Sequence, residues 1–564
     1  MLSKAPSYVH GASTQSLLPL TVAGLLEKTA GLHGDADALI VPHQGIRWTY
    51  RKLQNEVERY AAGFAALDLK PGERIGIWAP NCWEWVVTQF ASARAGLILV
   101  NINPAYRLGE LTYALETTGC AALIATRQFK TSNYLDMLRE LIPELADAKP
   151  GQLVSARFPD LRLMLLLGDE EETGFTRFET ILDIAGKTHL EQIETLQDRL
   201  QFDDPINIQF TSGTTGTPKA STLTHHNIVN NAYFVGLQMK LSEADRMCIP
   251  VPMYHCFGMV LGTLCCVAFG SAMVFSSTGF DAAEVLRTVD AECCTVLHGV
   301  PTMFIAELEV PEFKQRKLTS LRTGIMAGAP CPVELMRRVM DELHLTEITI
   351  AYGMTETGPV SFQTSVDDPV QRRVSTVGRV LPHIEIKIVD KEGLVVPRGE
   401  AGELLTRGYC VMPCYWNDPE RTAKAIDEAH WIASGDVATI DGEGYCEIVG
   451  RIKDMLIRGG ENIFPREIEE YLYQHPDIEQ VEVIGVPDEK FGEQVCAWVK
   501  LRVGSCTTAE DIRDFCKGKI AHFKVPQYVK FVEEFPMTVT GKVQKYIMRE
   551  KMVDELKNQQ SKTG

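Results

Sequence analysis

Residues 206–220 read INIQFTSGTTGTPKA, an apolar run followed at once by a loop rich in hydroxyl groups. The last ten residues, Thr211–Ala220, include four threonines, one serine and two glycines beside the single cation of Lys219. Hydroxyls and glycine amides suit phosphate oxygens as hydrogen-bond donors, and the lysine adds positive charge. The loop is not a Walker loop, which requires Gly-Lys-Ser/Thr where this chain has Pro-Lys-Ala. A surface linker is the alternative, but a place directly after a buried strand favours phosphate binding at the carboxyl end of a sheet.

Similar apolar runs recur through the first part of the chain. They are RIGIWAP at 74–80, AALIAT at 121–126, CTVLHGV at 294–300, RTGIMAG at 322–328 and ITIAYG at 348–353. Strands that are apolar on both faces, with helix-like segments between them, indicate parallel sheets covered by helices on both sides. We therefore expect an α/β fold for this part.

The pattern changes after about Thr376. HIEIKIVD at 383–390 alternates apolar and polar residues, and GELLTRG, WIASGDVATID and GYCEIVGR follow with short turns, which predicts a β-rich subdomain over about 376–450. Beyond it, Pro465 suits the first turn of a helix and EQVEVIGV alternates as a strand, so a small α+β unit is expected. The predicted boundary separates residues 1–452 from residues 453–564.

Composition limits the class of partner. The 564 residues are too many for one ordinary core, and their net charge of −18 argues against nucleic acid or an anionic membrane as the main partner. Fifteen cysteines, without CxxC pairs, argue against a disulfide framework or a zinc ribbon and favour a reducing compartment.

One uncharged segment, Cys256–Thr278, is long enough to suggest a membrane span. Glycines at 258, 262 and 270 interrupt it, and strand-like AMVF follows at 272–275. We expect a buried helix, a glycine stop and a buried strand, and therefore no transmembrane segment. The first residues, MLSKAPSYVHGASTQ, have no apolar run, so no secretory signal is expected.

Six further motifs follow the phosphate-loop candidate. They are PMYHCFG at 252–258, GAP at 328–330, YGMTET at 352–357, SGDVATID at 434–441, GRIKDMLIRGGENIFP at 450–465 and TVTGKVQK at 538–545. With these motifs in this order, the chain resembles the adenylate-forming superfamily of acyl-CoA synthetases, luciferases and peptide-synthetase adenylation domains over nearly its whole length. The resemblance implies that residues 1–452 bind AMP and the acyl group, and that residues 453–564 form a mobile domain with a catalytic lysine.

The resemblance also implies an ATP site. It consists of Thr211, Ser212, Gly213, Thr214, Thr215, Gly216, Thr217, Pro218, Lys219, Gly328, Ala329, Pro330, Tyr352, Asp436, Arg451 and Lys542. Tyr352 would offer its ring to adenine, and the small residues 328–330 would let backbone approach the adenine edge. Asp436 would accept bonds from the ribose hydroxyls, and Arg451 would reach the ribose or the phosphate. The alternative for Asp436 is a turn aspartate before a strand.

Three residues are implied to be catalytic. Thr355 would bond a phosphate oxygen, and Glu356 would hold Mg²⁺. Lys542 would neutralise charge as a carboxylate attacks the α-phosphate, since an unperturbed lysine is charged at pH 7 and is no obvious proton carrier. The alternatives are a cap-like Thr-Glu pair at a strand end and one more solvated lysine.

The implied reaction uses ATP, Mg²⁺ and CoA and has two halves. A carboxylate and ATP give an acyl-adenylate and pyrophosphate, and a thiol then gives a thioester and AMP. The C-terminal domain would rotate about Lys453 between the halves. Gly459 and Gly460 would then line the path of the CoA thiol, because glycines permit close approach.

The residues after PMYH are implied to line the acyl pocket, with His255 as a gate and Phe257 and Gly262 behind it. The run CFGMVLGTLCC contains no charged residue, so an amino-acid ammonium would lie unpaired there and a fatty acid fits better. His255 has an alternative as a hydrogen-bonded core histidine. No carrier-domain serine motif follows Lys545, so free CoA is the expected acceptor.

Within the superfamily, RGYCVM at 407–412, KDMLIRGGENI and FCKGKIAHFK at 515–524 are most similar to medium-chain acyl-CoA synthetases assigned to mitochondria. Medium-chain preference and a place in the mitochondrial matrix follow from that resemblance alone, with the cytoplasm as the alternative. A luciferase-like oxygenase and a ligase for long-chain or aryl acids remain as enzymatic alternatives. A nucleotide sensor would be expected to lack Lys542 or Glu356. The oligomeric state is open.

Three positions depart from the superfamily pattern. Ala220 and Cys414 stand where glycine is usual, and Ser434 replaces threonine before Gly-Asp. The methyl group of Ala220 puts the mobility of the phosphate loop in question. None of the changes removes a charged or metal-binding group, so an active enzyme is expected.

Overall fold

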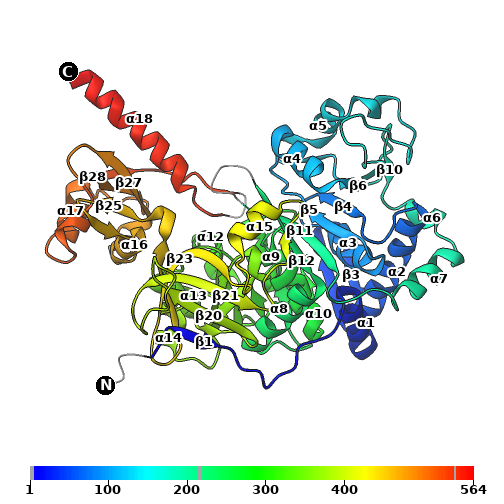
Figure 1. Ribbon diagram of the computed structural model, residues 1–564, viewed down its shortest axis with the longest axis horizontal. Coiled ribbons are helices and arrows are strands. Elements are labelled where there is room, and N and C mark those ends of the chain that lie inside the picture. Colours follow the sequence, from blue (N-terminus) through cyan, green and yellow to red (C-terminus); the bar gives the residue numbers. More distant parts are fainter. Residues whose placement is uncertain (1–4, 212–217, 539–540, 564) are drawn as a thin grey trace.

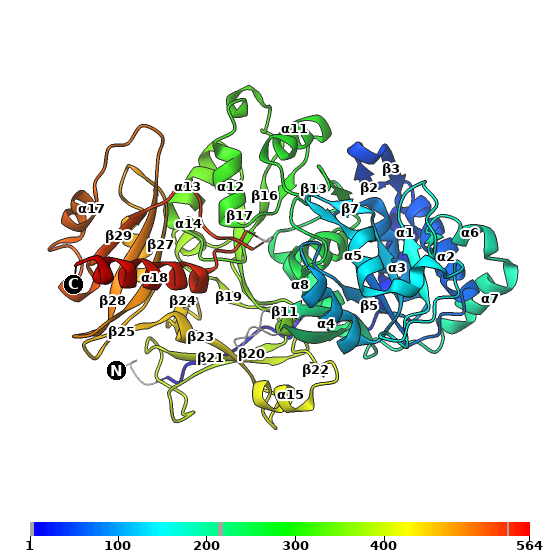
Figure 2. The ribbon, with the colours of Figure 1, turned by 90° about the horizontal axis from the view of Figure 1, so that it is seen from above.

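The computed structural model describes residues 5–211, 218–538 and 541–563, with side chains through residue 558. Figure 1 shows a large unit and a smaller C-terminal unit at its side. The last helix, α18 (Lys545–Thr563), packs against the smaller unit, and its C-terminal end points away from the large unit (Figure 1). In Figure 2 the smaller unit lies on the side of the large unit that carries α12 and α13.

The first sheet of the large unit has eight strands in the order β10-β9-β6-β4-β5-β11-β12-β22. The bounds are β4 (Arg74–Trp78), β5 (Ile98–Asn101), β6 (Cys120–Ala125), β9 (Leu163–Leu166), β10 (Thr176–Arg177), β11 (Pro205–Thr211), β12 (Lys219–Thr224) and β22 (Cys414–Tyr415). The apolar runs at 74–80, 121–126 and 206–210 form parallel strands, as expected. Strand β12 then returns antiparallel to β11, so the hydroxyl-rich loop connects the strands of a hairpin.

The second sheet has nine strands in the order β19-β18-β17-β16-β15-β13-β14-β2-β3. The bounds are β2 (Asp37–Val41), β3 (Ile46–Thr49), β13 (Arg246–Cys248), β14 (Ala272–Val274), β15 (Val296–Leu297), β16 (Thr323–Ala327), β17 (Glu347–Gly353), β18 (Val360–Gln363) and β19 (Arg379–Val380). The strands from β17 to β2 pair in parallel. The edge strands β3, β18 and β19 pair antiparallel, which the apolar runs alone did not predict.

Helices cover both sheets. The bounds are α1 (Val22–His33), α2 (Tyr50–Ala66), α3 (Trp83–Arg94), α4 (Leu108–Thr118), α5 (Tyr134–Leu141), α6 (Ile181–Ile184), α7 (Lys187–Leu196), α8 (His225–Gln238), α11 (Ala282–Glu292), α12 (Pro301–Leu308), α13 (Val333–Glu342), α14 (Val370–Ser375) and α15 (Pro419–Ala425). Helix α8 contacts both β12 and β18, so it lies between the two sheets. Leucines of α4 and α5 form a separate core with Trp78 and Val100 of the first sheet. Burial on both faces explains why these strands are continuously apolar.

The uncharged segment after Cys256 is part of the core. It forms α9 (Cys256–Gly258), a π-helical turn, η3 (Met259–Leu264), and α10 (Cys265–Phe269), which Gly270 ends at a φ of +74° before β14 begins. The prediction of a buried helix, a glycine stop and a buried strand is confirmed. Among the described residues, no helix has the length and apolar character that a membrane span requires.

A five-stranded antiparallel sheet follows, in the order β1-β20-β21-β23-β24. The bounds are β1 (Tyr8–His10), β20 (Ile384–Val389), β21 (Gly402–Gly408), β23 (Ile432–Ile440) and β24 (Cys446–Arg451). The last four strands coincide with the alternating runs in the sequence. Strand β1 comes from the other end of the chain and pairs with β20, a long-range contact that no local pattern predicts.

The C-terminal unit is an α+β fold joined to β24 by the turn η6 (Ile452–Asp454). Its elements are β25 (Leu456–Arg458), β26 (Glu461–Ile463), α16 (Pro465–Leu472), β27 (Ile478–Asp488), β28 (Gly492–Leu501), α17 (Ala509–Cys516) and β29 (Tyr528–Phe531). Pro465 stands at the first position of α16, and Thr508 and Asp511 form a capping box on α17. Because the unit has its own hydrophobic clusters, we propose η6 as the domain boundary.

Glu307 on α12 lends itself to a stability test. Its side chain is fully buried, and within the described part of the chain neither carboxyl oxygen has a hydrogen-bond partner. Burial raises the pKa of Glu307 well above its ordinary value of 4.5, so the folded chain holds a proton there that the unfolded chain releases. Stability is therefore lost as the pH rises from the unfolded pKa toward the folded one, by about 1.4 kcal/mol for each pH unit.

Glu307→Leu should remove this pH-dependent penalty. We expect a higher melting temperature than the parent at about pH 8 and a smaller difference at about pH 5. Calorimetry at the two pH values measures this difference. A variant that melts below the parent at the higher pH would contradict the assignment.

Candidate active site

The hydroxyl-rich loop follows the carboxyl end of β11 and precedes the first residue of β12 in the first sheet. Of the ATP-site residues predicted there, Ser212, Gly213, Thr214, Thr215, Gly216 and Thr217 lie outside the described residues. Thr211 ends β11, Pro218 is half-buried, and Lys219 begins β12 directly opposite Thr211. The hairpin thus places the ends of the loop next to one another.

These loop ends face the predicted metal ligand. Thr211 Oγ1 donates to Oε1 of Glu356 at 3.0 Å, and the Tyr415 hydroxyl donates to the same oxygen at 3.0 Å. Lys219 Nζ lies 3.4 Å from the Tyr415 hydroxyl and 5.0 Å from the centre of its ring. Thr355 is buried beside Glu356 in the turn η5 (Thr355–Thr357). Burial and the neighbouring Glu356 carboxylate raise the pKa of Tyr415.

Tyr415 was not among the predicted site residues. The only sequence signal was its place in the Tyr-Trp pair after the unusual Cys414. In the structure β22 pairs with β12, which carries Tyr415 to the phosphate-loop hairpin. The tyrosine therefore links Lys219 to Glu356.

A second cluster lies on the antiparallel sheet. Asp436 on β23 stands directly opposite Arg451 on β24, and Arg451 Nε lies 3.0 Å from Asp436 Oδ1. The Tyr352 hydroxyl donates to Asp436 Oδ2 at 2.6 Å. Burial and Asp436 raise the pKa of Tyr352 well above its ordinary value. Both carboxylate oxygens already accept one bond, and each keeps a lone pair for a ligand hydroxyl.

Lys542 comes to this cluster from the C-terminal unit. Its ammonium interacts with Arg451, Asp436 and Glu356, and its Cε lies 3.6 Å from where a side chain on Gly328 would begin. Burial, followed by the charge of Arg451, lowers the pKa of Lys542 to about 8, against the opposing effect of Asp436 and Glu356. One side chain thus lies beside three motifs of the large unit.

The pKa of Lys542 predicts a pH profile. A lysine with a pKa of about 8 is charged at neutral pH and loses its charge within the range where enzymes are assayed. If the charged form is required for the first half-reaction, kcat/KM of the free enzyme should fall about tenfold per pH unit above pH 8. The measurement is pyrophosphate release without CoA across the pH range. A flat profile up to about pH 10 would contradict the lowered pKa of Lys542, since a lysine of ordinary pKa stays charged over that range.

Of the predicted acyl-pocket residues, Phe257 and Gly262 are buried and His255 is half-buried. His255 Nδ1 accepts a bond from the Phe257 backbone N–H at 3.1 Å, and burial lowers the pKa of His255 to about 3, with a further lowering from Lys542. His255 is therefore neutral and caps the N-terminus of α9, which agrees with the core-histidine alternative. It also lies close enough to Lys542 for the lysine charge to affect its pKa. A side chain added at Gly262 would begin 3.0 Å from Ile249 Cγ2, so Ile249 would have to shift to admit it.

His298 was not found from the sequence. Its ring centre lies 5.5 Å from that of Phe257, and its Nε2 donates to the Leu261 carbonyl at 3.0 Å while Nδ1 accepts from the Ile325 N–H at 3.2 Å. Burial lowers the pKa of His298 to about 4, so the ring is neutral. The groups described next to His255, Phe257 and the His298 ring, are therefore uncharged.

The predicted hinge and tunnel residues lie apart from this cluster. Lys453 is exposed in η6, the turn that joins the two units. Gly459 and Gly460 form the exposed turn between β25 and β26, with φ values of +59° and +91°, and the Gly459 N–H donates to Phe491 within the same unit. The structure therefore brings Lys542 into the site but leaves the two glycines outside it.

A cavity of about 390 Å³ lies between the two units beside this site. Its walls include Tyr254 and Met303 from the large unit and Met537 from the C-terminal unit. They also carry the lysines Lys130 and Lys500 and the glutamates Glu309 and Glu479, and Lys500 forms an ion pair with Glu479. The charges on the walls are therefore mixed and do not by themselves select an anionic ligand.

The three unusual positions are accommodated in different ways. Ala220 is buried in β12, where its carbonyl accepts a bond from the Trp416 N–H at 2.7 Å, and Cys414 pairs with Thr222 in the same sheet. Ser434 Oγ donates to the Leu404 carbonyl at 2.8 Å and accepts from the Asp436 N–H at 3.1 Å. The serine keeps the hydroxyl that orients Asp436.

Comparison with known proteins identifies the family. Residues 26–416 match the AMP-binding enzyme family, and residues 467–542 match the AMP-binding enzyme C-terminal domain. A Danio rerio protein named as a mitochondrial medium-chain acyl-CoA ligase is 46% identical over 98% of this chain and 91% of its own length. A Bacillus subtilis protein, YngI, assigned by name to the acyl-CoA synthetases, is 48% identical over 95% of this chain and 98% of its own.

A solved structure shares the architecture. An anthranilate CoA ligase, AuaEII, in complex with anthranoyl-AMP, has a TM-score of 0.83 and 26% identity, covering 94% of this chain and 97% of the other. The family matches and the full-length identity place this chain in the AMP-binding enzyme family, the adenylate-forming superfamily that includes the acyl-CoA ligases.

Proposed function

We propose that this chain is an AMP-forming ligase that joins a medium-chain fatty acid to CoA with ATP. The observation that carries the proposal is the position of Lys542, which the C-terminal unit places beside Asp436, Arg451 and Glu356 of the large unit. The name of the Danio rerio relative, an acyl-CoA ligase for medium chains, supports the substrate class.

For the first half-reaction we assign roles by position. The loop Thr211–Lys219 would bind the phosphates, and residues 328–330 with Tyr352 would bind adenine. Asp436 would hold the ribose through its free lone pairs, with Arg451 orienting its carboxylate through the ion pair. The Lys542 ammonium would then stabilise the charge that develops as the carboxylate attacks the α-phosphate.

Glu356 would hold Mg²⁺ together with the phosphates of ATP, since this ion is usually bound by one or two carboxylates and substrate oxygens. The site fits the ion: the hydrogen bonds described for the carboxylate, over 5–211 and 218–538, fall on Oε1, which leaves Oε2 for a cation. When bound, the ion would neutralise phosphate charge. Thr355 would bond a phosphate oxygen beside it.

For the second half-reaction the C-terminal unit would rotate about Lys453, removing Lys542 and bringing Gly459 and Gly460 to the site. The rearranged interface between the units would then admit the CoA thiol. The cavity described above, part of whose wall belongs to the C-terminal unit, would be remodelled by this rotation.

The acid would occupy the buried region behind His255. Cys256–Phe269 is uncharged, and His298 and His255 are both held neutral, so the region suits an alkyl chain rather than a charged side group. This favours fatty acids over amino acids. A matrix location is supported by the mitochondrial name of the Danio rerio relative, whereas the Bacillus subtilis relative is bacterial and favours the cytoplasm.

The test is a substrate panel. Pyrophosphate, AMP and acyl-CoA should form in equal amounts with octanoate, ATP, Mg²⁺ and CoA, with lower kcat/KM for acetate, palmitate and benzoate. A preference for palmitate or benzoate would favour the long-chain or aryl-acid ligase. Consumption of oxygen or emission of light would favour a luciferase-like oxygenase. Nucleotide binding without any turnover would favour a sensor.

A further inference from the structure

The loop that carries Lys542 is held by contacts within the C-terminal unit. The Thr538 N–H donates to the Lys542 carbonyl at 2.8 Å, and the Lys542 N–H donates to Thr538 Oγ1 at 3.1 Å. Just beyond the loop, Lys545 Nζ lies 2.5 Å from Glu469 Oε1 and 3.3 Å from Glu482 Oε2. These contacts would travel with the unit when it moves. They fix the conformation of the loop but do not attach it to the large unit.

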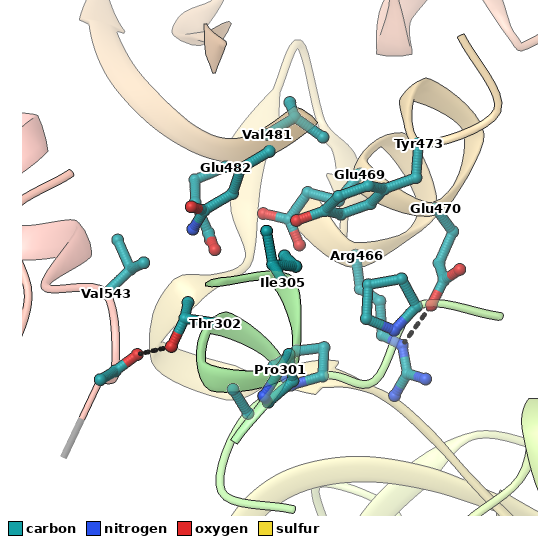
Figure 3. Close-up of a pocket in the computed structure, with 15 residues that line it drawn as sticks. Pro301, Thr302, Ile305, Arg466, Glu469, Glu470, Tyr473, Val481, Glu482 and Val543 are labelled. Carbon is teal, nitrogen blue, oxygen red and sulfur yellow. Dashed lines mark hydrogen bonds and ion pairs between the residues drawn. The ribbon is translucent and has the colours of Figure 1, made fainter. Parts of the chain in front are cut away.

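At Gly541, within the described part of this loop, a hydrogen bond joins the loop to the large unit. Thr302 Oγ1, in the first turn of α12, donates to the carbonyl of Gly541 at 3.3 Å, as the dashed line from Thr302 in Figure 3 shows. Gly541 is the residue directly before Lys542, so any shift of this carbonyl moves the base of the lysine side chain. Thr302 is half-buried and belongs to none of the motifs that first indicated the site.

The backbone of the loop also packs tightly at this point. Gly541 has a φ of +76°, and a Cβ there would lie 2.8 Å from Thr302 Oγ1 and 2.9 Å from Val300 Cγ2. Real Cβ atoms do not approach other atoms so closely, so a glycine is required. The start of α12 thus positions Gly541 in two ways: Val300 packs against its backbone, and Thr302 donates a hydrogen bond to its carbonyl.

We propose that Thr302 is a positioning residue for adenylate formation: its hydroxyl docks the Gly541 carbonyl and thereby sets the Lys542 ammonium in the cleft. The inference rests on the proposed function, because it assigns Lys542 to the first half-reaction. Thr302 belongs to the large unit and Gly541 to the moving one, so rotation about Lys453 breaks this bond. Thr302 therefore assists the first half-reaction and not the second.

Thr302→Val tests the proposal, since valine keeps the shape of the side chain and removes only the donor. A typical net hydrogen bond corresponds to a rate change of about three- to tenfold. In single turnover, octanoyl-AMP formation should slow by about that factor. Conversion of supplied octanoyl-AMP and CoA to octanoyl-CoA should stay within about twofold of the parent, because the bond is absent in that orientation. Thr302→Ser keeps the hydroxyl and should retain most of the parental adenylation rate.

The pH profile separates positioning from mere stability. A loop that is less firmly seated exposes Lys542 to water, so the alkaline fall in kcat/KM for adenylation should move upward in Thr302→Val, toward the ordinary lysine pKa. The matched control is Thr195→Val, which removes a hydroxyl-to-carbonyl bond of 2.8 Å on α7, at the far end of the large unit. It should leave both half-reactions and the profile as in the parent.

Two outcomes would overturn the inference. Equal slowing of both half-reactions, with a lower melting temperature, would show that Thr302 only stabilises α12. Parental adenylation with an unmoved pH profile would show that the hydroxyl does not seat the loop. Failure of the parent itself to make octanoyl-CoA is a separate result, which would refute the proposed function whatever Thr302 does.

Discussion

Lys542→Met should slow octanoyl-AMP formation by about 10³-fold, the loss expected when one preorganised group that stabilises transition-state charge is removed. Methionine matches the length of the side chain and removes the charge that lies beside Arg451, Asp436 and Glu356. Conversion of supplied octanoyl-AMP and CoA should continue near the parental rate, because the proposed rotation removes the lysine from the cleft before that half-reaction. Rapid-quench measurement of each half-reaction provides both rates.

Two further variants make this result specific. Lys542→Arg keeps a cation but spreads it over a planar group, so adenylation should recover only in part. Lys551→Met removes a lysine from the exposed side of α18 and should leave both rates unchanged. If Lys542→Met formed the adenylate at the parental rate, the assignment of Lys542 would be wrong.

Lys453→Pro should have the opposite effect on the two half-reactions, slowing the second and sparing the first. Proline fixes φ near −65° and so restricts the turn η6, which joins the two units. The arrangement observed here, with Lys542 in the cleft, should stay accessible, and adenylation should change little. Thioester formation should fall by roughly 100-fold, because the C-terminal unit could not reach the orientation proposed for the second half-reaction.

The control for the hinge is Lys453→Ala, which removes the side chain but keeps backbone freedom. Both half-reactions should remain near the parental rates. The two half-reactions are assayed separately, with supplied octanoyl-AMP for the second. Equal loss of both in Lys453→Pro would show that residue 453 is not the pivot.

The sequence predicts those parts of the fold whose residues carry a local signal. Continuous apolar runs predict β4, β6, β11, β16 and β17, and alternation predicts β20, β21, β23 and β24. Strand β1 and the antiparallel edges have no such signal, because their pairing partners are far away in the chain. Edge pairing depends on long-range contacts, which local propensity does not encode.

The site residues also fall into those that the sequence predicts and those that only the structure reveals. Asp436, Arg451, Glu356 and Lys542 carry unusual chemistry in recognisable motifs, and the structure brings them together. His298, Tyr415 and Thr302 act through neighbours that only the fold supplies, so their spacing in the sequence carries no signal. The position of Gly459 and Gly460 depends on the orientation of a whole unit, which residue patterns do not encode.

The central claim is that the carboxylate attacks the α-phosphate and that AMP later leaves with one of the carboxylate oxygens; isotope labelling can test it. Octanoate labelled with ¹⁸O in its carboxylate is converted with ATP and CoA, and the AMP is analysed by mass spectrometry. The mechanism predicts one ¹⁸O in each AMP, because the bridging oxygen of the adenylate comes from the acid and stays on phosphorus when the thiol attacks the carbonyl. Unlabelled AMP, or ADP with ¹⁸O in orthophosphate, would contradict it.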